Sequence, residues 1–273
     1  MCHIMKRLLN KRTTKIVSSN SPLTFETTGG GSWEVWDRFI AVNGQNIYHI
    51  GNVCGTCSFF FEKLIDNKKS INPKETIDKL NVGLIFIDDN TIDILREIIP
   101  NGFYEIALLT ITPKFTVVGQ PNDYFAKEQV DLWGIDGYYG VPHSPKVNYY
   151  RGSDKEIGDD RKIFEFFIPL TSTENLDQKR VDFYKEKILK GNKPTAISLS
   201  TLDIKEPAVW PEDDIKPEFT SHWCIAHYIV DGHHKIKAAC DLNSEITLLS
   251  FIATEKGISS TDDINELLKH IDN

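Results

Sequence analysis

One stretch, residues 225–252, constrains the fold of this chain more than any other. Residues 227–230 (HYIV) have the composition of a strand, and the strand pattern stops at an Asp-Gly pair. After Gly232, apolar residues recur at helical spacing over 233–242. The pattern therefore predicts a strand that turns at a glycine and passes directly into a helix.

The first turn of that predicted helix has the chemistry of an anion site. Its backbone N–H groups lack partners within the helix and carry the positive end of the helix dipole. His233, His234 and Lys235 add donors for a phosphate at the same place. Asp231, just before the turn, is able to hold a hydroxyl, a ribose or a magnesium ion. The alternative is that Asp231 caps the helix and the histidines are surface polar residues.

The run IVDGHHKIKAA, residues 229–239, resembles the D-G-H-H-R-x-x-A-A signature of the ParB/sulfiredoxin superfamily. Its members include chromosome-partition CTPases, sulfiredoxins and ADP-dependent free-serine kinases. Other segments resemble the family's opening strand, helix, second strand and closing strand in order, at 168–170, 181–191, 193–199 and 246–252. The resemblance covers residues 162–253, and the rest of the chain resembles no family that we can name.

This chain departs from each branch of the superfamily in a different way, and these differences indicate which branch it resembles most. A partition protein has a helix-turn-helix after the signature, and about twenty residues after residue 252 leave no room for one. Sulfiredoxin needs a reactive cysteine where this chain has His233. The serine-kinase branch has a catalytic glutamate between the first strand and the helix, and Glu174 resembles it in placement, although Thr173 replaces that branch's preceding histidine. The alternative role for Glu174 is to stabilise the start of the next helix.

The resemblance implies a nucleotide- or phosphate-binding protein, and our first hypothesis is a Mg2+-dependent phosphotransferase or nucleotide hydrolase that uses ATP, ADP or CTP. Phosphate would lie at the helix start, while a carboxylate would serve the magnesium ion or accept the proton of the nucleophile. The expected catalytic residues are Glu174, Asp231 and His233, and Asp231 is also the expected magnesium ligand. The expected nucleotide-binding residues are Gly232, His233, His234, Lys235 and Ser198.

Composition limits the partners. The chain has 39 acidic and 31 basic residues and a net charge of −8, which opposes non-specific attraction to a polyanion, so we expect no nucleic acid. It lacks a run of 18 apolar residues, and its five cysteines are scattered, which indicates a cytoplasmic protein without a membrane partner. Our second hypothesis is a non-catalytic interaction protein that keeps the fold and binds a protein partner through an apolar patch on residues 33–160.

Cys54 and Cys57 form a C-x-x-C pair with three alternative roles: half of a zinc site, a redox pair at a helix N-terminus, or two buried structural thiols. Zinc needs four ligands as a rule, so the remaining ones would come from His49 or from the segment 222–227.

The predicted fold class is α+β. A small mixed sheet with flanking helices, of the ParB/sulfiredoxin type, forms a domain over 161–273. A β-rich α+β domain over 33–160 packs against it, and 1–32 is a flexible leader. Other predicted elements are a hairpin that turns at Asn43-Gly44, buried helix 58–65, helix 72–80, buried strand 82–87, helix 91–99, an acidic loop over 203–220 and helix 262–271.

Overall fold

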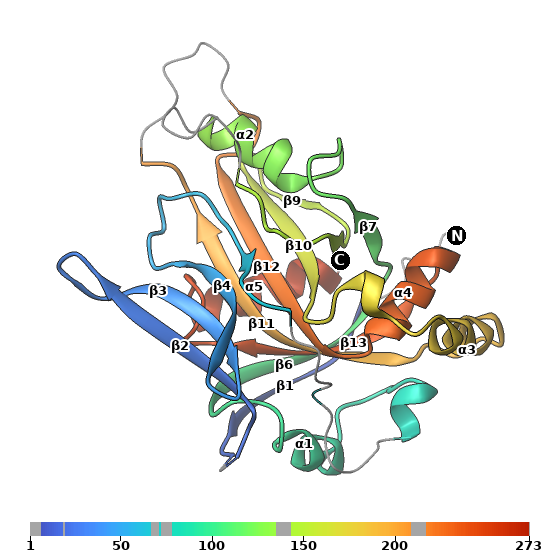
Figure 1. Ribbon diagram of the computed structural model, residues 1–273. Helices are drawn as coiled ribbons and strands as arrows, with labels where there is room; N and C mark the ends of the chain where they lie inside the picture. The colour runs from blue at the N-terminus through green and yellow to red at the C-terminus, as the bar shows by residue number, and fades with distance from the viewer. Residues whose placement is uncertain are drawn as a thin grey trace.

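The computed structural model describes residues 7–18, 20–66, 71, 78–134, 143–208 and 217–272. The protein is mixed α+β, with a nine-stranded mixed sheet and a separate four-stranded antiparallel sheet (Figure 1). The large sheet contains β1 (Leu8–Ile16), β6 (Gly102–Ile111), β7 (Lys114–Thr116), β8 (Tyr149–Arg151), β9 (Lys155–Ile157), β10 (Arg161–Pro169), β11 (Thr195–Lys205), β12 (Ser221–Asp231) and β13 (Ile246–Ala253). The small sheet contains β2 (Leu23–Gly30), β3 (Trp33–Val42), β4 (Gln45–Asn52) and β5 (Glu62–Lys63). The α-helices are α1 (Asp89–Leu95), α2 (Glu128–Trp133), α3 (Gln178–Leu189), α4 (His233–Leu242) and α5 (Thr261–Asp272).

The strands of the large sheet follow the order β1-β6-β13-β11-β12-β10-β8-β7, and β9 pairs with β10. The pairs β11–β13 and β10–β12 are parallel, and the other pairs are antiparallel. Its central strands are β10, β11, β12 and β13. Along the chain, α3 lies between β10 and β11, and α4 lies between β12 and β13. The strands and helices that the sequence predicts over 162–253 are therefore present.

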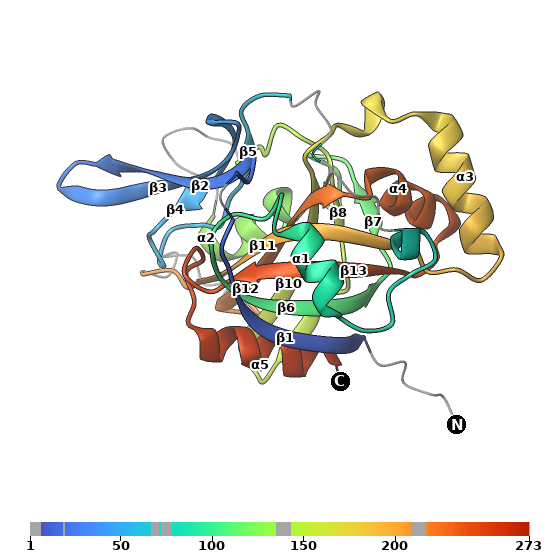
Figure 2. The ribbon, with the colours of Figure 1, turned by 90° about the horizontal axis from the view of Figure 1, so that it is seen from below.

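Both faces of the large sheet are buried at its central strands, β10 to β13. Successive side chains of a strand point to opposite faces. On β10, Phe164 and Phe166 belong to one hydrophobic cluster, and Ile163 and Phe167 belong to the other. The small sheet and α1 contribute to the first cluster, whereas α3, α4 and α5 contribute to the second. Figure 2 shows α3 and α4 side by side at one end of the sheet and α5 at another. The protein therefore has three layers: the small sheet with α1, the large sheet, and the helices α3, α4 and α5.

Two described segments of the predicted flexible leader form strands. Residues 8–16 form β1, which pairs with β6, and residues 23–30 form β2, which pairs with β3. The burial of β1 alternates along the strand, so a segment with few large apolar residues is sufficient for an outer strand that buries one face. Since β1 and β6 extend the central strands, the large sheet takes strands from both sides of the predicted boundary at 160/161.

The hairpin at Asn43-Gly44 is confirmed. Val42 lies opposite Gln45, and both turn residues have positive φ, 50° for Asn43 and 77° for Gly44. This conformation is the one that favours an Asn-Gly turn between two strands. The predicted helix 91–99 is present as α1, which spans Asp89–Leu95 and so ends four residues earlier than predicted. The side chain of Asp88 caps it by accepting a hydrogen bond from the Thr91 amide at 2.9 Å.

Two predictions in the N-terminal half are wrong. Residues 58–65 form an extended segment that contains β5 rather than a helix, because Phe59 and Phe61 are both buried while the residue between them is less so, which is the period of extended chain. Residues 82–87 form a loop rather than a buried strand, and Ile85 and Phe86 are exposed.

Other predictions fall partly outside the described residues. The predicted helix 72–80 lies mostly outside them, and the loop over 203–220 begins after β11, with its middle outside them. The C-terminal helix is confirmed as α5.

Candidate functional site

The turn between β12 and α4 is held tightly against β11. Gly232 is the N-cap of α4 in the left-handed conformation, with φ of 94°. A Cβ atom at this position would lie 2.8 Å from the Cα of Ala196, closer than real Cβ contacts allow. Glycine is therefore required here both for its backbone conformation and for the close approach of the strand.

The two histidines of the first turn bind the backbone of the loop 171–177. The Thr171 amide donates to Nε2 of His233 at 3.1 Å, and the Asp177 amide donates to Nε2 of His234 at 3.2 Å. Burial lowers the pKa of His233 to about 4 and also lowers the pKa of His234. Both imidazoles are thus neutral at pH 7, and these nitrogens are acceptors that fasten the loop to α4.

The space beside the His233 ring is narrow, although the residue itself stays partly exposed. Its neighbours there are mostly apolar and leave no room for a water molecule: Tyr150, Pro169, Thr171, Thr173, Leu176, Ile229 and Ile236. The predicted anion site needs the His233 ring to face a ligand, whereas the loop packs against α4 and its Thr171 amide occupies Nε2 of His233.

Lys235 and Ser198 lie in the interior. The Lys235 ammonium donates to the Thr195 carbonyl oxygen at 2.8 Å and lies 3.4 Å from Oδ2 of Asp231. The Ser198 hydroxyl is bonded to that of Ser200 at 3.0 Å, and both serines are fully buried. The structure thus gives Lys235 and Ser198 contacts within the fold rather than an open phosphate site, because the long lysine side chain turns back along β11.

The two predicted catalytic carboxylates lie on different elements. Asp231, a partly exposed residue, ends β12 and pairs with Lys235. Glu174 is exposed in the short 3-10 helix Thr173–Asn175 and accepts a hydrogen bond from the Thr173 hydroxyl at 3.1 Å.

Glu174 lines a pocket of about 230 Å3 that we call the Glu174 pocket. Its lining residues are Val118, Ser144, Lys146, Val147, Asn148, Ser172, Thr173 and Glu174. It joins the loop after β10 to the segment before β8, and the backbone contact from the Lys63 amide to the Pro145 carbonyl at 3.0 Å brings β5 beside it. Two segments far apart in sequence therefore form one polar surface.

The polar groups of the Glu174 pocket are positioned by the residues around them. Ser172 Oγ accepts from the Lys63 ammonium at 2.6 Å and donates to Asp66 Oδ1 at 2.8 Å. Asn148 Oδ1 accepts from the Val118 amide at 3.1 Å, which leaves its NH2 group as a donor. Lys146 adds an ammonium, which pairs with Glu62. The pocket thus combines hydroxyls, an amide and a cation with the carboxylate of Glu174.

Sequence reasoning identified Glu174 but missed the opposite wall of this pocket. Lys146, Ser144 and Asn148 come from a polar, turn-rich stretch, 141–160, that the sequence indicates only as a domain boundary or a long functional loop. No motif indicates that this stretch faces the loop after β10, because the contact depends on where the sheet places β8 and β10.

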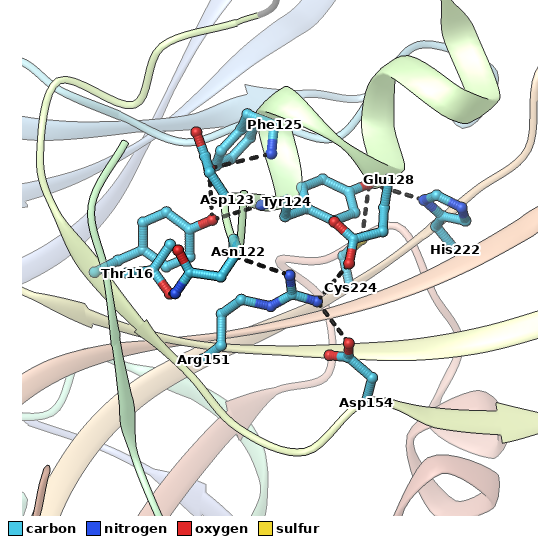
Figure 3. A network of polar contacts seen from close by, with 11 residues as sticks. Thr116, Asn122, Asp123, Tyr124, Phe125, Glu128, Arg151, Asp154, His222 and Cys224 are labelled. Carbon is cyan, nitrogen blue, oxygen red and sulfur yellow. Dashed lines mark hydrogen bonds and ion pairs between the residues drawn. The ribbon is translucent and has the colours of Figure 1, made fainter. Parts of the chain in front are cut away.

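A second polar network, away from this pocket, is shown in Figure 3. The Arg151 guanidinium bonds Glu128 at 2.9 Å and Asp154 at 2.7 Å, and the Tyr124 hydroxyl lies 2.9 Å from Nδ1 of His222. Burial lowers the pKa of His222 to about 3. These contacts attach α2 and the segment before it to the large sheet. We therefore interpret the network as structural.

The proposed zinc ligands are not gathered in one place. Cys54 and Cys57 are joined in a disulfide, so zinc binding by this pair requires its reduction. His222 bonds Tyr124, and His227 bonds Ser200 within the interior. Among the described residues there is no group of three or more His, Cys, Asp or Glu side chains arranged to hold a metal ion.

No family model matches this chain, and neither a curated protein nor a solved structure matches it significantly. Among the helices of the described residues, none has the length and apolar composition needed to cross a membrane.

Proposed function

We propose that this protein binds a small phosphate-bearing ligand, with a nucleotide as the first candidate, in the Glu174 pocket. The observation that carries the proposal is the placement of Glu174, which shares this pocket with Lys146 and three hydroxyl-bearing side chains. Ammonium and hydroxyl groups are donors for phosphate oxygens, and a carboxylate beside them is able to bind Mg2+ or accept a proton from an attacking hydroxyl. The proposed activity is phosphoryl transfer or nucleotide hydrolysis.

The D-G-H-H-K segment has a supporting role in this proposal. His233 and His234 hold Thr171 and Asp177, which flank the residues that face the pocket. The resemblance of 229–239 to the ParB/sulfiredoxin signature supports a phosphate ligand, and the order of strands and helices over 162–253 agrees with it. Fold similarity alone does not determine activity, so the pocket residues carry the argument.

The test is isothermal calorimetry and turnover with ATP, ADP and CTP, each with and without Mg2+. Lys146→Ala is expected to weaken binding by about tenfold or more, since it removes the cation of the pocket. Glu174→Gln is expected to retain binding without Mg2+ and to lose turnover. Lys190→Ala, an exposed lysine at the end of α3, is the matched control and should leave both unchanged. If no nucleotide binds the unaltered protein, the nucleotide proposal is wrong.

A second candidate function is protein–protein interaction without catalysis. Ile85 and Phe86 are neighbours in a loop and are 78% and 55% exposed, which is unusual for adjacent large apolar residues. Trp33, 59% exposed, lies on the β2–β3 hairpin, which projects from the body of the protein (Figure 1). In a cellular assay of function, this candidate predicts that Glu174→Gln and Asp231→Asn are tolerated and that Phe86→Ser is not.

A further inference from the structure

We propose that Cys54 and Cys57 form a reversible thiol–disulfide exchange site, separate from the Glu174 pocket. The two cysteines are disulfide-bonded, and both are partly exposed in the loop Cys54-Gly55-Thr56-Cys57 that follows β4. The reaction partner is a dithiol reductant, which the site oxidises to its disulfide.

The loop places two donors at Sγ of Cys54. The Cys57 amide donates to this sulfur at 3.1 Å, and the Thr56 hydroxyl lies 3.4 Å from it. A disulfide sulfur has no proton to give, so the hydroxyl is the donor in the second contact. When the S–S bond breaks, the same donors are in place to stabilise a thiolate on Cys54, which makes Cys54 the better leaving group.

Three hydrogen bonds hold the loop backbone independently of the disulfide. The Lys205 ammonium donates to the Cys54 carbonyl at 2.6 Å, the Glu206 amide donates to the Gly55 carbonyl at 3.0 Å, and the Trp133 indole donates to the Thr56 carbonyl at 3.1 Å. These contacts keep the two cysteines close together after reduction, so the bond is able to form again.

A purely structural role explains this disulfide poorly. The bond spans a sequence separation of only three residues. A short loop loses little chain entropy when it is closed, so the cross-link adds less stability than one that joins distant segments. The hydrogen bonds from Lys205, Glu206 and Trp133 already attach the loop to the fold.

The exchange reaction has two steps. A thiolate of the external dithiol attacks Sγ of Cys57, the S–S bond breaks, and its electron pair leaves on Sγ of Cys54. The second thiol of the reductant then loses its proton and attacks the reductant's own sulfur in the mixed disulfide, which releases Cys57 as a thiolate. Each protein thiolate takes up a proton. The site gains two electrons and two protons, and the dithiol loses the same number.

The test exposes the folded protein to dithiothreitol or to glutathione, labels free thiols with iodoacetamide and assigns each label by peptide mapping. We expect dithiothreitol to release Cys54 and Cys57 together, while buried Cys224 stays unlabelled. Oxidised dithiothreitol should then restore the disulfide. In Cys54→Ser, glutathione disulfide should form a mixed disulfide on Cys57.

A second measurement separates an exchange site from an ordinary exposed disulfide. In Cys57→Ser, Cys54 should react with iodoacetamide about tenfold faster than free glutathione does at neutral pH. Adding Thr56→Val should slow that reaction. The proposal is overturned if the pair is reduced only after unfolding in urea, if Cys54 reacts no faster than glutathione, or if the reduced pair binds zinc and becomes unreactive.

Discussion

Arg38 and Asp203 form a buried ion pair with two hydrogen bonds that joins the small sheet to the large sheet. Nη1 of Arg38 lies 3.0 Å from Oδ1 of Asp203, and Nη2 lies 2.6 Å from Oδ2. Arg38 is on β3 and Asp203 is on β11, and both side chains are less than 10% exposed. The Ile258 amide also donates to Asp203, at 2.9 Å. The pair therefore connects three separate parts of the chain.

Removing Arg38 should destabilise the protein strongly. Arg38→Met leaves the buried Asp203 carboxylate without its cation, and we expect the free energy of unfolding to fall by about 3–5 kcal/mol. Urea denaturation followed by circular dichroism measures this change. The control is Arg161→Met, which removes a partly exposed pair with Glu266 and should cost less than about 1 kcal/mol. Equal losses in the two variants would contradict the role that we give to the buried pair.

Stability should fall as the pH is lowered from 8 to 5. Burial lowers the pKa of His222 to about 3 and that of His233 to about 4, from an ordinary value of 6.5. Below pH 6.5 the unfolded chain binds protons that the folded protein does not, so stability is full above pH 6.5 and is lost as the pH falls toward these lowered values. Each histidine should contribute a loss of about 2 kcal/mol at pH 5.

The His222→Gln variant tests this assignment. Glutamine has no titrating group, so the variant should lose less stability between pH 8 and pH 5 than the unaltered protein does, as measured by urea denaturation at each pH. An unchanged pH dependence would mean that the His222 imidazole accepts a proton in the folded protein.

Gly232→Ala should be much more damaging than Gly191→Ala. Both glycines have positive φ, 94° and 87°, so alanine is strained at each, by about 1 kcal/mol. A Cβ at position 191 meets nothing within 4 Å, whereas at 232 it meets the backbone of Ala196 at 2.8 Å. The difference in unfolding free energy between the variants, about 1–3 kcal/mol, measures the overpacking at the start of α4. Similar losses would show that the close approach of β11 is relieved at little cost.

Lys235→Met should lower stability without weakening ligand binding. The Lys235 ammonium satisfies the buried Thr195 carbonyl, and its loss should cost about 1–3 kcal/mol. Lys237→Met, on the same helix but more exposed, is the control and should change stability little. Calorimetry with the ligand that the unaltered protein binds distinguishes the two roles of Lys235. If Lys235→Met loses much affinity and Lys237→Met does not, the phosphate site lies at the start of α4 rather than in the Glu174 pocket.

The sequence by itself determined the local features that depend on neighbouring residues. The Asn43-Gly44 hairpin, the turn at Gly232 and the helix of α5 follow from backbone conformation and from periodicity along one segment. The predictions for residues 58–65 and 82–87 are wrong, because the periodicity of a short apolar run does not distinguish a helix, a strand and a packed loop.

Only the tertiary structure decided which side chains face a ligand. The two histidines after Gly232 have the composition of an anion site, yet the loop 171–177 packs over them and uses their nitrogens as hydrogen-bond acceptors. Lys146 and Glu174 share a pocket because the positions of β8 and β10 in the sheet bring their loops together. Burial and contacts between distant segments arise from the packing of the whole chain, and no local pattern encodes them.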